Sequence, residues 1–149
     1  MYEKIISSIK KSYLAGFLDA DGSIYVQAKP NKTYRFGFQV APYIVFYQSL
    51  KDEKYFSNVC SMIGLGHKRV RKDGIVEHII SKQEELIEFI NLIEPYLIMK
   101  KAQLKLLKKI IQLKKNVRSE DDFIELMKLI DKFRDLNYSK KRKKRTLTP

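Results

Sequence analysis

Hydrophobic residues recur with two different periods along the first third of the chain, first a helical period and then an alternating one. Over residues 8–20 the large apolar side chains recur at spacings of three and four, as in Ile9, Tyr13 and Phe17, which predicts a helix. Over residues 23–29 every second position is apolar, which predicts a half-buried strand. Residues 30–33 have turn chemistry, and a second alternating strand is expected over residues 34–48. Pro42 lacks an N–H, so this strand should be bulged, bent or at a sheet edge there.

Over the rest of the chain the sequence pattern predicts a helix, a hairpin and three further helices. In chain order these are a helix over residues 50–63, strands over 67–72 and 75–80, and helices over 81–93, 101–115 and 123–136. Gly64 is a plausible stop for the first of these helices. Asp73 and Gly74 are a strong turn signal between the two strands. The helix over residues 101–115 is amphipathic and rich in lysine.

Capping residues mark the start of two of these helices. Ser81 and Glu84 have capping-box spacing, and Ser119 with Asp122 repeats it. The element order is therefore α-ββ-α-ββ-α-α-α, which predicts an α+β fold with the helices gathered on one face of an antiparallel sheet. No linker divides residues 1–137, so we expect a single domain there, followed by a basic tail over residues 138–149.

Charge favours a polyanionic partner. The 149 residues include 30 Lys and Arg against 17 Asp and Glu, for a formal charge of +13 and a sequence pI near 9.7, and nucleic acid is the leading candidate. No apolar run approaches the ~20 residues that span a bilayer, and no secretory signal is visible. Cys60 stands alone, which predicts a reduced intracellular compartment.

Two carboxylates lie where the first helix should end. Gly22 is a plausible glycine stop, so Asp19 and Asp21 fall in or just after the last turn, at the negative end of the helix dipole. A carboxylate there is disfavoured by up to roughly 1 kcal/mol unless a cation compensates it, and a divalent metal would do so. The alternative interpretation is that both are solvated turn residues. Small residues on the same helix, including Ala15 and Gly16, leave a strip where another helix could pack closely.

The ten residues 14–23 read Leu-Ala-Gly-Phe-Leu-Asp-Ala-Asp-Gly-Ser. This string resembles the signature of the LAGLIDADG homing endonucleases, departing from it by Phe17 and by Leu18. The similarity runs from about residue 13 to 144 and is to single-motif, homodimeric members encoded in group I introns. It implies the LAGLIDADG fold, with an αββαββα core, a DNA-binding antiparallel sheet and extra C-terminal helices.

The resemblance also implies a catalytic site. Asp21 matches the family's principal metal-ligating aspartate, and the main-chain carbonyl of Ala20 is a further ligand. Gln48 would orient or polarise the attacking water, and Lys100 would stabilise phosphate charge or help to activate that water. The implied cofactor is Mg²⁺, for which Mn²⁺ substitutes. Asp19 matches the first acidic position of the motif, for which we expect a structural role.

One position departs from the family pattern. Where a relative carries a basic active-site residue, this chain has Asp52, so that role is unfilled or passes to Lys51 or Lys54, of which Lys51 is preferred. A single motif per chain implies that two chains complete the site, since cutting two strands needs two sets of ligands. The residues expected at the dimer interface are Tyr13, Leu14, Ala15, Gly16, Phe17 and Asp19.

DNA recognition is expected on the outer face of the sheet, because a two-stranded ribbon fits the major groove. By position and by resemblance the DNA-binding residues are Gln27, Lys29, Asn31, Thr33, Tyr34, Gln39, Arg69, Arg71 and Glu77. Apolar residues on the same face, Ala41, Tyr43, Val45 and Ile79, would either contact thymine methyls or indicate a different register in the second strand. In the tail, Ser139, Lys140 and Lys143 are expected to contact the phosphate backbone, although a basic run alone is typical of a solvated tail.

The predicted function is a homodimeric, Mg²⁺-dependent, site-specific endonuclease that cuts a long pseudo-palindromic DNA duplex and so starts intron homing. Two alternatives stay open: an RNA maturase that binds its host intron without hydrolysis, and a DNA-binding repressor that has lost nuclease activity. The expected partners are double-stranded DNA and a second copy of the chain, with intron RNA as a further candidate and no membrane. The expected location is an organelle (chloroplast or mitochondrion) or a prokaryotic cytoplasm.

Overall fold

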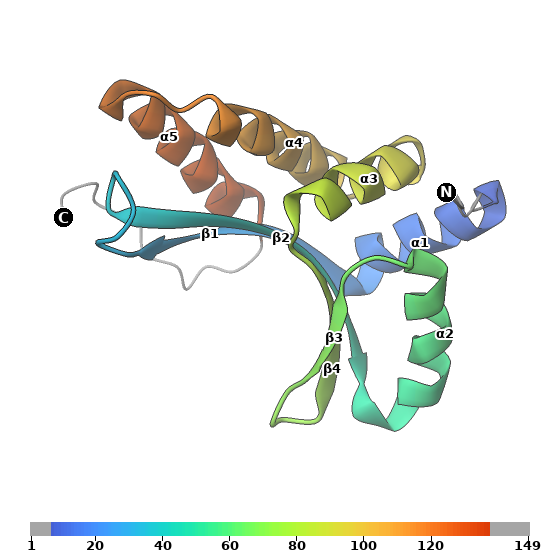
Figure 1. Ribbon diagram of the computed structural model, residues 1–149. Helices are drawn as coiled ribbons and strands as arrows, with labels where there is room; N and C mark the ends of the chain where they lie inside the picture. The colour runs from blue at the N-terminus through green and yellow to red at the C-terminus, as the bar shows by residue number, and fades with distance from the viewer. Residues whose placement is uncertain (1–6, 138–149) are drawn as a thin grey trace. The chain divides into compact units, whose positions relative to one another are not determined.

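The computed structural model describes residues 7–137, which form two compact units (Figure 1). Among these residues, unit 1 combines 7–23 with Tyr43–Lys101, and unit 2 combines Ile24–Pro42 with 102–137. Unit 1 holds α1 (Ser8–Asp21), the end of β2 (Phe38–Ser49), the 3₁₀ turns η1 (Leu50–Asp52) and η2 (Glu94–Tyr96), α2 (Glu53–Ile63), β3 (His67–Val70), β4 (Ile75–Ile80) and α3 (Gln83–Ile93). Unit 2 holds most of β1 (Gly22–Pro30), the start of β2, α4 (Lys101–Lys115) and α5 (Glu120–Leu136).

The four strands have the order β1-β2-β4-β3. Strand β4 is antiparallel to both of its neighbours, with Val45 opposite Ile79 and Arg69 opposite Glu77. The predicted α+β class and the predicted order of helices and strands are confirmed. The division into one domain over residues 1–137 stays a prediction.

An aromatic cluster joins the three helices of unit 1 to β2. The ring centroid of Phe17 on α1 lies 5.7 Å from that of Phe46 on β2 and 6.0 Å from that of Phe56 on α2. Phe46 in turn meets Phe89 of α3 edge to face at 5.8 Å. Aromatic pairs at these separations add to the stabilisation that burial gives. Helices α1, α2 and α3 therefore share the face of β2 that carries Phe46.

A second cluster holds unit 2 together. The ring of Phe123 at the start of α5 stacks on Phe36 at 5.0 Å and on Phe38 at 6.2 Å. On β1 the apolar positions Ile24, Val26 and Ala28 are buried, as their alternation predicts. The intervening positions of β1, from Tyr25 to Lys29, alternate to the opposite face.

The second strand begins later than expected. Alternation predicts a strand from residue 34, but β2 begins at Phe38 and residues 31–37 form a closed loop. The N–H of Asn31 donates to the carbonyl of Gly37 at 2.8 Å, and Gly37 donates back to the carbonyl of Tyr34 at 2.9 Å. Gly37 has φ +80°, a conformation that glycine adopts readily, so the backbone is not extended at this residue. Phe36 is apolar because it packs on Phe123, not because it belongs to a strand.

Pro42 is buried within β2, whose neighbours in the sheet are β1 and β4. Pairing of β2 with β4 runs only from Ile44 to Ser49, so the missing N–H of Pro42 lies outside that ladder.

Helix capping follows the prediction at one of the two expected sites. Ser119 and Asp122 form the capping box, so α5 begins at Glu120, three residues earlier than expected. The predicted box at Ser81 is wrong, since α3 has Lys82 as its N-cap and no side-chain cap. Glu85 instead accepts a hydrogen bond from the N–H of Gly66 at 2.7 Å. Among residues 7–137, no helix is long and apolar enough to cross a membrane.

Gly22 ends α1 by allowing a close approach to Leu18. Helix α1 ends at Gly22 as predicted, but the φ of −100° and ψ of 177° of this residue are extended and not left-handed. A Cβ at Gly22 would lie 2.4 Å from Cδ1 and 2.9 Å from Cα of the fully buried Leu18. Glycine is required here because helix and strand meet more tightly than a side chain permits.

We expect Gly22→Ala to lower the free energy of unfolding by about 1–3 kcal/mol, because relieving the clash must shift either Leu18 or the α1–β1 backbone. Urea unfolding followed by circular dichroism measures this loss. Asn58→Ala on the exposed face of α2 is the control and should change stability by less than about 0.5 kcal/mol. An unchanged Gly22→Ala protein would contradict the role assigned to the glycine.

Candidate active site and nucleic-acid interface

Asp21 is the last residue of α1 and its side chain is exposed. Its carboxylate has no hydrogen bond or ion pair within residues 7–137. The last turn of α1 contains no basic residue, so nothing on the helix itself compensates a negative charge at its negative end. The last carbonyls of a helix also lack intrahelical partners. The end of α1, including Ala20 and Asp21, is therefore a cluster of oxygen atoms suited to a cation.

Asp19 fixes the segment that carries Lys100. One carboxylate oxygen of Asp19 accepts the N–H groups of Ile98 and Met99 at 2.9 and 3.1 Å, and the other accepts the N–H of Lys100 at 2.9 Å. The Nζ of Lys100 donates to the main-chain carbonyl of Asp19 at 2.6 Å. These four contacts join the end of α1 to the segment over residues 98–100. They bring an ammonium group to the end of α1, two residues before Asp21.

Gln48 lies near the end of β2 in the same unit and is half-buried. Its Oε1 accepts the N–H of Ser49 at 2.9 Å. Within residues 7–137 no hydrogen bond joins Gln48 to Asp21 or to Lys100. The structure thus brings Lys100 to the end of α1, but it does not join Gln48 directly to Asp21 or Lys100.

The residues around Asp52 are exposed and stay unassigned. Lys51 donates its main-chain N–H to Oγ of Ser49 at 3.3 Å, which fixes its backbone and not its ammonium. Side chains of Lys51, Asp52 and Lys54 are exposed. In the part of the chain that the structure describes, no three His, Cys, Asp or Glu side chains gather to hold a metal ion.

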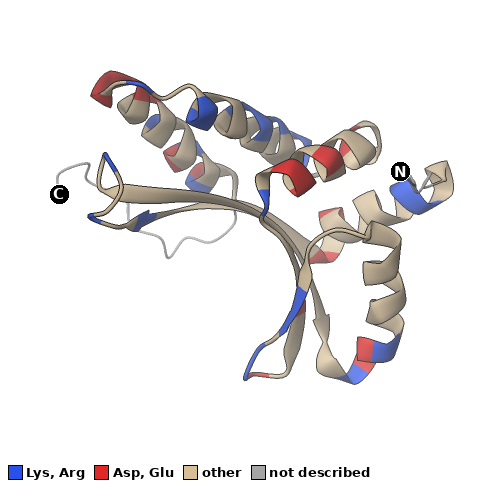
Figure 2. Ribbon diagram, in the orientation of Figure 1, with Lys and Arg blue, Asp and Glu red and all other residues tan. Residues whose placement is uncertain are grey.

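Arg69, Arg71 and Glu77 gather on the outer face of the β3–β4 hairpin, as predicted. Arg69 lies opposite Glu77 in the ladder, and the guanidinium of Arg71 contacts Asp73 at 2.5 Å and Glu77 at 3.7 Å. The hairpin turn that follows carries Lys72, so the end of this hairpin is rich in cations (Figure 2). The carboxylates beside Arg71 orient its guanidinium without removing it from solvent.

The apolar residues of this face keep the predicted register. Val45 lies opposite Ile79, while Phe46 points to the helices, so the alternative register is excluded for this part of β2. Val45 is 1% exposed and Ile79 is 8% exposed. They leave little surface for contact with a thymine methyl.

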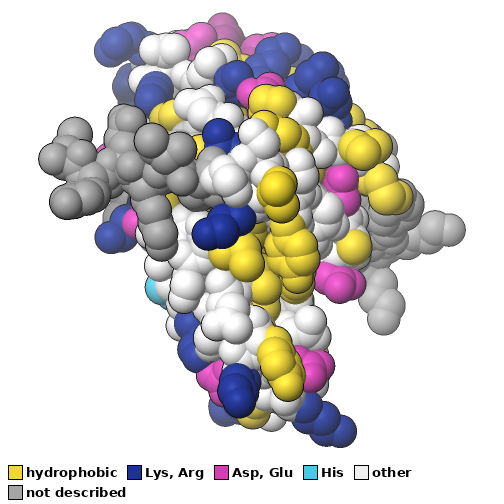
Figure 3. Space-filling view, turned by 90° about the vertical axis from the view of Figure 1, so that its right-hand side faces the viewer, with side chains coloured by type: hydrophobic (Ala, Val, Ile, Leu, Met, Phe, Trp, Pro, Cys, Tyr) yellow, Lys and Arg dark blue, Asp and Glu magenta, His cyan; other side chains and the backbone are white. Residues whose placement is uncertain are grey.

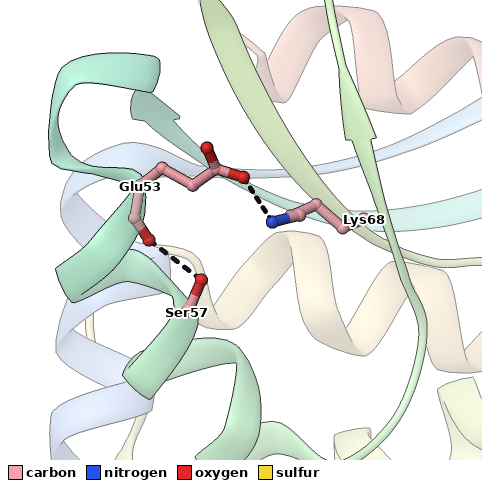
Figure 4. A network of polar contacts seen from close by, with 3 residues as sticks. All are labelled: Glu53, Ser57 and Lys68. Atoms are coloured by element: carbon pink, nitrogen blue, oxygen red, sulfur yellow. Dashed lines mark hydrogen bonds and ion pairs between the residues drawn. The ribbon is translucent and has the colours of Figure 1, made fainter.

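Lys68 faces away from Arg69 because neighbouring strand residues alternate. Its Nζ donates to Oε1 of Glu53 on α2, and the main-chain carbonyl of Glu53 also accepts the hydroxyl of Ser57 at 2.9 Å (Figure 4). This contact fixes the edge strand β3 to α2. Burial raises the pKa of the nearby Cys60 thiol, and the charge of Lys68 opposes that rise.

Predicted DNA-binding residues of unit 2 lie on β1, on the loop over residues 31–37 and at the start of β2. Lys29 and Tyr34 are exposed, whereas Gln27 and Gln39 are half-buried. Asn31 has a role inside the loop, since its Oδ1 accepts both the N–H of Thr33 at 3.0 Å and its hydroxyl at 2.7 Å. The predicted tail contacts Ser139, Lys140 and Lys143 lie outside the described residues.

Fewer side chains of α1 are available to a dimer interface than the sequence predicts. Leu14 is 1% exposed and Ala15 is fully buried within the chain itself, so neither side chain offers a surface to a second subunit. Tyr13 and Gly16 are exposed, and Phe17 is half-buried in its aromatic cluster. A Cβ at Gly16 would meet no atom within 4 Å beyond its chain neighbours and the backbone of its own helix.

Further apolar side chains of unit 1 extend this surface. Sequence reasoning missed Ile98 and Met99, which are 81% and 70% exposed, and it did not place Ile9 at an interface. Hydrophobic side chains form a nearly continuous band on the face that the space-filling view presents (Figure 3). The sequence offered one signal for these exposed residues, because Ile98 and Met99 form an apolar pair directly before Lys100.

Comparison with known proteins identifies relatives of this chain. The family described as LAGLIDADG endonuclease matches residues 14–112. DNA endonuclease I-CreI of Chlamydomonas reinhardtii is 36% identical over 132 residues, which cover 88% of this chain and 80% of that protein. DNA endonuclease I-CvuI of Chlorella vulgaris is 32% identical over 134 residues, covering 90% and 83%.

Solved structures give the same result. The crystal structure of the homing endonuclease I-CvuI in complex with the I-CreI target, in the presence of Mg, has a TM-score of 0.85 and 32% identity, and the match covers 91% of this chain and 86% of that one. The DNA-bound archaeal intron-encoded homing endonuclease I-Vdi141I, at 22% identity and a TM-score of 0.81, shares the fold.

Proposed function

Because this chain belongs to the LAGLIDADG endonuclease family, we propose that it is a homing endonuclease that cuts both strands of a long, nearly palindromic DNA site. Cleavage of an allele without the intron would start copying of the intron into it. The relatives named above support this proposal, since both are DNA endonucleases and their similarity extends over most of the chain. The net charge of +13 suits a polyanionic substrate.

The observation that carries the proposal is the pairing of an exposed carboxylate with a positioned ammonium at one helix end. Asp21 is exposed there, and Lys100 is fixed to the carbonyl of Asp19. A purely structural aspartate would be expected to bond a nearby N–H or cation, as Asp19 does. Asp21 makes no such bond within residues 7–137, so its carboxylate is available to a ligand.

The oxygen atoms at this helix end fit a hard divalent cation such as Mg²⁺, with Mn²⁺ as a substitute. The carboxylate of Asp21 and the main-chain carbonyl of Ala20 would hold it. Bound there, such a cation supplies charge stabilisation to the attacking and leaving oxygens of a phosphodiester. Each chain contributes one Asp21, so two chains would be needed to serve two DNA strands.

Hydrolysis requires that water attack phosphorus, that the bridging P–O bond break, and that the leaving alkoxide gain a proton. Lys100 would lie beside the phosphate and stabilise its added negative charge, since its Nζ is already held at the end of α1. Gln48 would orient the water: its Oε1 is fixed by Ser49, which directs the amide group of the same side chain. No covalent enzyme intermediate is needed.

The proposed dimer seam follows α1. Tyr13 and Gly16 are exposed on this helix, and a small residue lets two helices approach closely. Two-fold pairing through α1 would bring two copies of Asp21 toward one another, since each lies at the end of the paired helix. The exposed apolar residues of unit 1 would be covered by the same contact.

We expect Gly16→Leu to weaken dimerisation at least tenfold while the single chain stays folded. The added side chain enters open space within the chain but would occupy the seam where the helices meet. Sedimentation equilibrium over a range of protein concentrations measures the change. The matched control is Asn58→Leu on α2, also at an exposed helical position, which should dimerise normally. If Gly16→Leu remains dimeric at the parental dissociation constant, α1 is not the seam.

Selection of cleaved sites from a randomised duplex library in Mg²⁺ tests the proposed function. The expected result is a long consensus with two-fold symmetry and breaks in both strands. Recovery of no cleaved duplex in either Mg²⁺ or Mn²⁺ would overturn the nuclease proposal. A splicing assay on intron RNA would then test the maturase interpretation.

A further inference from the structure

Helix α4 carries a row of lysines that the proposed cleavage site does not use. Its sequence contains six lysines and no acidic residue. Three of them, Lys105, Lys109 and Lys115, form what we call the α4 lysine stripe. All three side chains are exposed, and none has a hydrogen bond or ion pair within residues 7–137. Lys108, which does interact with another residue, lies on the same side of the helix.

Two of the stripe lysines, Lys105 and Lys109, lie on the side of α4 that faces away from the core of unit 2, opposite the buried Leu104, Leu107, Ile110 and Ile111. Lys115 is exposed at the last position of the helix. Lys114 is the exception, since it lines an apolar groove with Phe36 and Phe123, and burial lowers its pKa. The stripe is therefore an exposed row about 15 Å long, at about 1.5 Å of rise per residue.

Within unit 2 the DNA-binding residues predicted on β1 lie on a different side from Lys105 and Lys109, whereas Tyr34 of the loop lines the same groove as Lys114. Phe36 and Phe38 pack on α5, and α4 is joined to α5 where Nε2 of Gln103 donates to the carbonyl of Leu136 at 3.4 Å. Gln27 and Lys29 alternate away from the buried residues of β1. The lysine positions of α4 are coloured blue along its ribbon in Figure 2. DNA bound on the strands would thus leave the stripe open.

We propose that the α4 lysine stripe binds the phosphate backbone of a second segment of duplex DNA, so that the protein transfers directly from one segment to another during its target search. This inference rests on the proposed function, which places the protein on DNA, where other segments are abundant. Three unpaired ammonium groups along one helix suit the dense phosphate charge of a duplex. The contact is independent of base sequence because lysines on phosphates carry no sequence information.

Other occupants fit the stripe less well. A membrane-surface helix needs an exposed apolar side, but the apolar side of α4 is buried in the core of unit 2. A stable protein partner would require apolar anchors, and the stripe is interrupted only by polar residues such as Gln112 and Asn116. Duplex DNA needs neither feature, because release of counterions drives its binding.

A two-duplex capture experiment tests the proposal. The selected cognate duplex is fixed to beads and saturated with the full protein in Ca²⁺ without Mg²⁺, and a labelled non-cognate duplex is then added. The test variant is K105Q/K109Q/K115Q. The control variant K82Q/K128Q/K132Q removes the same charge from exposed lysines, one at the N-cap of α3 and two on α5. Parental and control proteins should retain the second duplex, and the stripe variant should not.

The salt dependence of second-duplex capture gives a quantitative readout. Losing three phosphate contacts should reduce the log–log slope by about 2.7, at roughly 0.9 per contact. Cleavage of the cognate site by the stripe variant at low DNA concentration should stay at the parental rate. Equal capture by the stripe and control variants would overturn the proposal, as would stronger displacement by structured RNA or anionic vesicles than by duplex DNA. Failure of the protein to bind the first duplex would instead refute the proposed function, and this inference with it.

Discussion

We expect Asp21→Asn to lower the rate of DNA cleavage by about a thousandfold, while binding of the cognate duplex is retained. Asparagine keeps the size of the side chain but removes the negative charge that would hold a divalent cation. A single oriented electrostatic group is typically worth about 10²–10³ in rate. In a two-fold dimer the substitution affects both copies of the site, so the combined loss should reach the upper end of that range.

Single-turnover cleavage in Mg²⁺ measures the rate, and a mobility-shift titration measures binding. Asp121→Asn is the matched control, because Asp121 is also exposed but lies in the first turn of α5. It should cleave at the parental rate. If Asp21→Asn also cleaves at that rate, the assignment of Asp21 as a metal ligand is wrong. If instead it loses binding and cleavage together, the carboxylate supports the fold and not the chemistry.

The second large effect concerns Asp19. We expect Asp19→Ala to lower the free energy of unfolding by about 2–3 kcal/mol, because its carboxylate accepts three main-chain N–H groups at 2.9–3.1 Å. The loss is limited because two of those N–H groups belong to the exposed residues Ile98 and Met99 and can be hydrated after the substitution. Asp19→Asn keeps a neutral acceptor, so its loss should be smaller.

Cleavage by Asp19→Ala should also fall, even at temperatures where the protein stays folded. Without the carboxylate, the segment before α4 is no longer fixed to α1, and the Nζ of Lys100 loses its defined position. Urea unfolding and single-turnover cleavage measure the two effects separately. Asp135→Ala, at an exposed site near the end of α5, should change neither. A stable, fully active Asp19→Ala protein would show that the four contacts of Asp19 do not position Lys100.

Local sequence patterns were sufficient to predict several features of this protein. The change from a helical to an alternating period between residues 20 and 23 placed Asp21 at the end of α1, and the Ser119 capping box marked the start of α5. Alternation alone put Arg69 and Glu77 on one face of the hairpin. These features depend on residues within a few positions of one another, so the sequence contains what determines them.

Tertiary structure decided the features that join distant segments. Asp19 and Lys100 are 81 residues apart, and nothing near either one indicates that they meet. Lys68 contacts α2, and Leu14 and Ala15 are enclosed by the chain's own side chains instead of lying on the surface of α1. The strand expected from residue 34 became a loop because Gly37 and Asn31 close it. In each case packing or a hydrogen bond to a distant or competing partner outweighs the local pattern, and only the folded chain brings that partner into reach.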